Sequence, residues 1–60
     1  MAEGKIDPEE RAAAARYVAA LAADLANISR RHGFDTLGHL LDIAKLEADN
    51  AVRNLEGLNP

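Results

Sequence analysis

The stretch Arg30-Arg31-His32-Gly33-Phe34-Asp35-Thr36 decides the fold of this chain, because it holds a helix stop followed at once by a helix start. Gly33 can adopt the left-handed conformation that closes a helix, and the cationic side chains before it suit the negative end of a helix dipole. Asp35 or Thr36 is a typical N-terminal cap for a second helix. The sequence therefore predicts a turn at residues 33–35 between two helices.

The segment before this turn has the features of a long helix. It opens with Asp7-Pro8-Glu9-Glu10, in which Asp7 can cap free amides, Pro8 suits the first helical position, and the glutamates lie at the positive end of the dipole. From Pro8 to His32 there is no Gly and no further Pro, and most of the 13 alanines of the chain lie in this segment. We expect a helix over about residues 8–32.

The segment after the turn predicts a second helix over about residues 36–56, ended by Gly57 and Asn59-Pro60. Gly38 lies in its first turn and costs about 1 kcal/mol relative to Ala, so either this end frays or another group packs very closely there. A connection this short requires the two helices to lie antiparallel. The expected fold is an all-α, antiparallel two-helix hairpin that forms a single domain over residues 1–60.

Apolar residues recur at alternating spacings of four and three, which is typical of helices that pack along a seam. We expect the following residues to meet inside the hairpin: Ala14, Val18, Leu21, Leu25 and Ile28 of the first helix, and Leu37, Leu41, Ala44, Ala48, Ala51 and Leu55 of the second. In this register large side chains mostly oppose small ones, which allows close packing.

A second set of residues with the same spacing is left over once the hairpin is closed. It consists of His39, Ile43, Leu46 and Asn50 on the second helix, and Ala12, Ala15, Ala19, Ala22 and Ala26 on the first. We predict that these residues form a dimer interface, so that two hairpins pair into a four-helix bundle. Higher oligomers or a foreign partner would use the same faces. The alternatives are isolated surface aliphatics and a merely compositional alanine bias.

The composition favours self-association of a small protein. The chain has 60 residues, no cysteine and a net charge of −3, and alanines make up 13 of its apolar residues. A core this small rarely stabilises a domain of this length by more than about 3 to 5 kcal/mol, and disulfides are excluded here. No apolar run is long enough to cross a membrane, and no signal peptide is recognisable, so we expect a cytoplasmic protein that does not use a membrane.

The sequence offers little for catalysis, and we expect a non-catalytic protein without a cofactor. Ser29, the only serine, is expected to hydrogen-bond to its own helix backbone. His32 is expected to complement the helix end as a cation. His39 lies four residues from Asp35 and three from Asp42, which leaves a metal-binding protein as a remote alternative, although neither spacing is an established metal motif.

The basic cluster Arg30-Arg31-His32, with Arg16 and Asn27 on a similar side, gives a second functional hypothesis. Two-helix hairpins that pair into a bundle resemble, in outline, the small Rop-type RNA-binding regulators of plasmid copy number. The resemblance is one of architecture alone. The basic cluster places the hypothetical nucleic-acid contact at Arg16, Arg30 and Arg31, which the acidic net charge opposes. The leading hypothesis is a protein–protein interaction module: a small homodimeric adaptor, regulator or subunit, whose partners are a second copy of itself and another protein.

Overall fold

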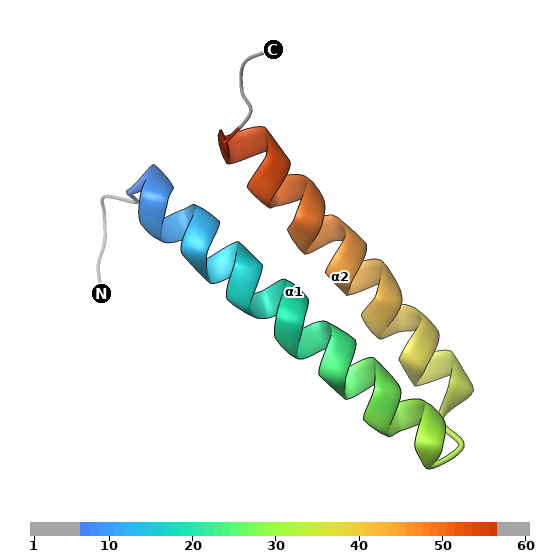
Figure 1. Ribbon diagram of the computed structural model, residues 1–60. Helices are drawn as coiled ribbons and strands as arrows, with labels where there is room; N and C mark the ends of the chain where they lie inside the picture. Colours follow the sequence, from blue (N-terminus) through green and yellow to red (C-terminus); the bar gives the residue numbers. More distant parts are fainter. Residues whose placement is uncertain (1–6, 57–60) are drawn as a thin grey trace, which may run out of the picture.

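The computed structural model describes residues 7–56, which form two helices packed side by side. Helix α1 runs from Pro8 to Arg31 and helix α2 from Asp35 to Glu56. The helices lie antiparallel, with the turn at one end and the start of α1 beside the end of α2 at the other (Figure 1). The predicted all-α hairpin is therefore confirmed. The expected stop at Gly57 and Asn59-Pro60 lies outside the described residues.

The first helix begins as its sequence predicts. The carboxylate of Asp7 accepts a hydrogen bond of 3.0 Å from the backbone N–H of Glu9 and so satisfies one of the free amides of the helix end. Pro8 occupies the first turn, where its missing N–H costs nothing, and Glu9 and Glu10 place negative charge at the positive end of the dipole.

The turn is closed by two backbone hydrogen bonds around a left-handed glycine. Gly33 has φ +84°, its N–H donates to the carbonyl of Arg30 (3.0 Å), and the N–H of Phe34 donates to the carbonyl of Ser29 (2.8 Å). This pair of bonds is the Schellman motif, which satisfies the last carbonyls of a helix. Gly33 was expected to have this conformation, and the motif explains why the chain reverses within three residues.

The second helix begins one residue earlier than predicted. The carbonyl of Phe34 already accepts a hydrogen bond of 2.9 Å from the N–H of Gly38, so Asp35 is the first helical residue and the turn covers residues 32–34. The prediction of Asp35 or Thr36 as the cap is therefore wrong. The carboxylate of Asp35 lies within the first turn instead, where its negative charge still interacts favourably with the positive end of the helix dipole.

Small residues hold the two helices together. The buried residues of α1 are Ala12, Ala19, Ala22, Ala26 and Ser29, and those of α2 are Gly38 and Ala48. Among the residues described, no large side chain is fully buried. Because each alanine contributes a single methyl group, worth about 0.8 kcal/mol when buried, the interior of one hairpin gives little hydrophobic stabilisation.

In the structure, the face of the first helix that contacts α2 is the one that the sequence predicted for the dimer interface, and the face predicted to contact α2 is exposed. The alanines predicted for the dimer interface face α2: Ala12, Ala19, Ala22 and Ala26 are buried and Ala15 is partly buried. The predicted hairpin residues Val18, Leu21, Leu25 and Ile28 are exposed. On α2 the prediction is closer, since Ala48 is buried and Leu41, Ala51 and Leu55 are partly buried, whereas Leu37 and Ala44 are exposed.

The physical reason for this exchange is the close approach that alanines permit. A stripe of methyl groups lets two helix backbones pack directly against each other. The larger residues of the heptad pattern lie beside this contact, on an open side of the helix pair. In a helix bundle, a further layer of helices lies on that side. Alanines with at most 6% exposure have almost no surface left for a second copy of the chain.

Gly38 is explained by an arginine from the other helix. A Cβ atom at this position would lie 3.0 Å from Cγ of Arg30 and 3.3 Å from its Cζ and Nε atoms. The same Arg30 side chain continues to Asp42, with which it forms an ion pair across the two helices. Of the two explanations offered by the sequence, close packing is therefore the one the structure shows.

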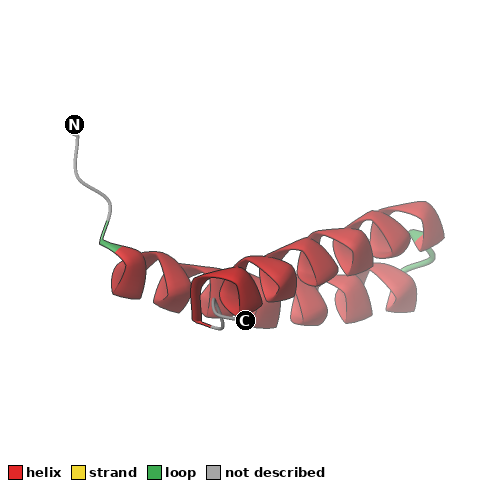
Figure 2. Cartoon of the chain, turned by 90° about the horizontal axis from the view of Figure 1, so that it is seen from above, coloured by secondary structure: helices red, strands yellow, loops and turns green. Residues whose placement is uncertain are grey.

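The hairpin is one helix thick. Viewed from above, the two helices form a single shallow layer, and the smallest principal extent of the molecule is 13 Å (Figure 2). A helix with its side chains is about 10 to 12 Å across, so both broad sides of the hairpin are surface.

Candidate interaction surface

An apolar groove runs between α1 and α2 on one broad side of the hairpin. Its volume is about 210 Å³, and it is lined by Tyr17, Val18, Leu21, Ala22, Leu25, Leu41 and Ala44. Leu21 and Leu25 come from α1, and Leu41 and Ala44 come from α2, so both helices contribute. This groove defines the side on which the large apolar residues of the chain gather.

Further large residues continue this surface toward the turn. Ile28 follows Leu25 by three residues on α1, and Leu37 and Leu40 precede Ala44 by seven and four on α2, so each shares a side with its groove residue. We call the combined surface the apolar face; it consists of Val18, Leu21, Leu25, Ile28, Leu37, Leu40, Leu41 and Ala44. Six of its large side chains are 43–55% exposed.

Part of this face is not predicted by the two stripes of apolar residues. Leu40 belongs to neither stripe, although its spacing of three from Leu37 and four from Ala44 is the signal that finds it. Tyr17, which lines the groove beside Val18, was missed as well. A large apolar area open to water on both helices is typical of a surface that contacts another protein.

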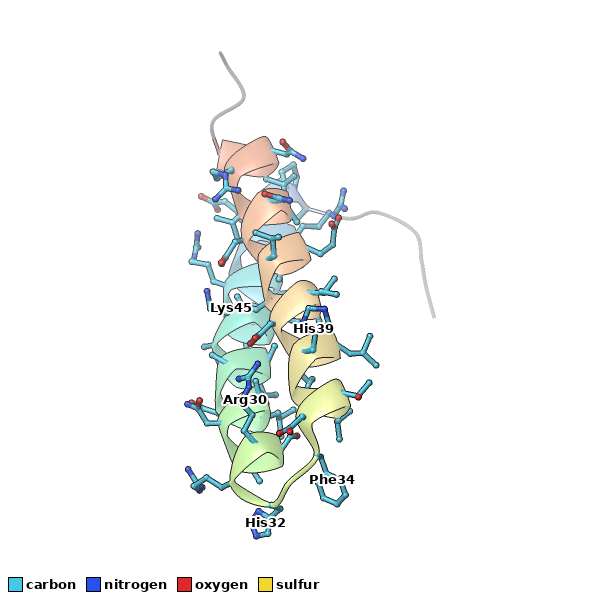
Figure 3. The ribbon with its side chains drawn as sticks, turned by 90° about the vertical axis from the view of Figure 1, so that its right-hand side faces the viewer. Arg30, His32, Phe34, His39 and Lys45 are labelled. Carbon is cyan, nitrogen blue, oxygen red and sulfur yellow. The ribbon has the colours of Figure 1, made fainter. Side chains whose placement is uncertain are left out.

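Charged side chains lie outside the apolar face. Arg30 reaches from α1 to Asp42 on α2, and Lys45 forms an ion pair of 2.8 Å with Asp49 one turn further along the same helix (Figure 3). None of the residues that line the apolar groove is charged. The hairpin as a whole is thus amphipathic, because the apolar groove and the charged side chains lie on different parts of its surface.

The predicted interface residues of the second helix remain on the outside of the hairpin. His39 is exposed and projects away from α1 (Figure 3), and Ile43 and Leu46 are exposed as well. Asn50 is partly buried, and its side-chain oxygen accepts a hydrogen bond from Arg53. These four residues form a narrower outer strip than the apolar face, with two large aliphatic side chains.

The three arginines proposed for nucleic-acid contact do not gather at one place. Arg30 and Arg31 lie at the turn, where Arg30 is paired with Asp42 and Arg31 borders a hollow of about 280 Å³ with Asp24. Arg16 borders a hollow of about 320 Å³ near Pro8 at the other end of the hairpin. Arg16 and Arg30 are 14 residues apart on one helix, which is about 21 Å along its axis.

The candidate catalytic and metal residues take part in local structure. The hydroxyl of Ser29 donates to the carbonyl of Leu25 (2.8 Å), which confirms the expected bond to its own helix. The ring Nδ1 of His32 lies 3.0 Å from the carbonyl of Ile28, at the helix end where it was expected to act. Within residues 7–56, His39, Asp35 and Asp42 belong to no group of three or more side chains that could hold a metal ion.

Neither helix of the described chain is long and apolar enough to pass through a membrane. No protein-family model, curated protein or solved structure matches this chain. The outline resemblance to Rop-type regulators consequently rests on the hairpin alone, and the functional argument depends on the surface described above.

Proposed function

We propose that this chain is a non-catalytic protein–protein interaction module, a small adaptor, regulator or subunit that works as a homodimer of two hairpins in a four-helix bundle. The observation that carries the proposal is the apolar face itself. The interior of one hairpin contains only small side chains, while six large aliphatic side chains of the apolar face stay about half exposed. A second hairpin laid on this face would supply the missing core.

The energy available from this face supports a dimer that forms in the micromolar range or above. Burying the exposed half of one large aliphatic side chain gains about 1 kcal/mol, so six from each copy gain about 12 kcal/mol. Association costs at least about 4 kcal/mol in lost motional freedom. The remainder is therefore at most about 8 kcal/mol, which corresponds to a dissociation constant of about 1 μM or weaker and sets the concentration range for the test.

Sedimentation equilibrium at 1 to 300 μM tests the proposal on three proteins: the unmodified chain, Leu21→Asp and Leu46→Asp. Leu21 belongs to the apolar face, whereas Leu46 is 57% exposed on the outer strip of α2 and receives the same substitution as a matched control. We expect a dimer for the unmodified chain and for Leu46→Asp. Leu21→Asp should weaken the dimer at least 100-fold, because a carboxylate would have to enter the interface without a partner.

Two results would overturn this account. If the unmodified chain has the mass of a monomer at 300 μM, the homodimer is wrong. If Leu46→Asp dissociates the dimer and Leu21→Asp does not, the interface lies on the outer strip of His39, Ile43, Leu46 and Asn50, as the sequence predicted.

A further inference from the structure

Large and small apolar residues are distributed unequally along the hairpin. All ten large hydrophobic side chains that are exposed in the described chain lie between Tyr17 and Leu46, so residues 8–16 of α1 and 47–55 of α2 contribute none of them. In the part nearer the termini, the apolar face is continued by helical spacing through Ala14 on α1 and through Ala51 and the partly buried Leu55 on α2. The exposed large side chains of the apolar face therefore lie toward the turn, and Ala14 and Ala51 leave less side-chain bulk toward the termini.

This distribution distinguishes the two ways in which two such faces can pair about a two-fold axis. If both turns lie at the same end, bulky parts meet each other and the alanine parts face each other across a gap. If the turns lie at opposite ends, the bulky part of each copy lies over the alanine part of the other. Close-packed interiors favour large side chains opposite small ones and leave few voids.

We infer that a second copy of this chain covers the apolar face with its turn at the opposite end, so that Leu25 and Ile28 of one copy pack near Ala14 of the other. This inference rests on the proposed function and adds the orientation of the two hairpins. Each bulky part thereby gains the flat surface that its own hairpin lacks, which makes the face complementary to itself.

The size of the broad side that carries the apolar face fits a second copy. The 24 residues of α1 give a length of about 36 Å, and two helices side by side are about 20 Å wide, so the broad side covers roughly 700 Å². A stable protein interface uses about 800 Å² per partner. A single foreign helix would cover only about half of this width, whereas a second hairpin matches both its length and its width.

The absence of cysteine from the sequence allows a clean measurement with single-cysteine spin labels. Thr36→Cys places a label beside the turn, and Ala13→Cys places one near the start of α1; both positions are exposed. Pulsed dipolar spectroscopy on the full chain measures the distance between the two Thr36 labels of a dimer. In a mixed sample, a fluorescent donor at Thr36→Cys of one copy and an acceptor at Ala13→Cys of the other measure the complementary distance.

With the turns at opposite ends, the two Thr36 labels should be separated by about 36 Å, the length of a helix, and the mixed pair should lie within about 20 Å. A Thr36 to Thr36 distance below about 20 Å in a sample of dimeric mass would overturn the orientation and leave the proposed function intact. A monomeric mass without any dipolar coupling at 300 μM would overturn both.

Discussion

Replacing Ala26 by Leu tests the alanine contact between the two helices most severely. Ala26 is 1% exposed and lies in the row of alanines that faces α2. Leucine adds three carbon atoms where the helices have no space for them, so α1 and α2 must separate or the side chain must leave its preferred rotamer. Such overpacking costs about 1 to 3 kcal/mol.

Ala20→Leu is the matched control, because Ala20 lies on the same helix with its side chain exposed. Thermal unfolding followed by circular dichroism at one fixed protein concentration compares the two variants. A loss of about 2 kcal/mol lowers the Tm of Ala26→Leu by roughly 8 to 16 °C in a domain of this size, while Ala20→Leu should stay close to the unmodified chain. Equal Tm values for the two variants would refute the alanine contact.

Three further substitutions test the helix ends and the glycines by the same unfolding measurement. Gly33→Ala should lose about 1 kcal/mol, because φ is +84°, and Gly33→Asn should lose less; equal losses would show that the left-handed conformation is not required. Gly38→Ala should bring no gain in stability in the unmodified chain, because the new Cβ atom would crowd Arg30. In an Arg30→Ala background, where the crowding atoms are gone, it should gain about 1 kcal/mol. An equal effect in both backgrounds would contradict the close contact. Asp7→Ala should cost about 1 kcal/mol through the lost cap, and an unchanged Tm would contradict the capping role of this carboxylate.

The helices and the turn could be predicted from the sequence because their signals are local. Asp7, Pro8 and Gly33 act through the conformation and the hydrogen bonds of their own backbone neighbourhood, and the structure places each of them where the sequence indicated. The predicted start of the second helix was wrong by one residue. The first hydrogen bond of this helix is accepted by the backbone carbonyl of Phe34, a residue whose side chain gives no capping signal.

The faces of the first helix could not be assigned correctly from spacing alone. The alanine row beginning at Ala12 and the larger row beginning at Ala14 have the same periodicity, so periodicity does not decide which one meets the partner helix. The choice depends on how closely two backbones approach, which is a property of the pair. Gly38 indicated only that another group approaches the start of the second helix closely, here Arg30, and did not indicate which row of the first helix meets it.

The dependence of Tm on protein concentration tests most directly the central proposal that a partner copy buries the large apolar side chains of this hairpin. Circular dichroism melts of the unmodified chain between 1 and 300 μM measure it. If folding and association are coupled, Tm rises steadily with concentration, because mass action stabilises the dimer. A Tm that stays constant over this range, together with cooperative unfolding of a monomer, would show that one hairpin is stable alone and would contradict the account.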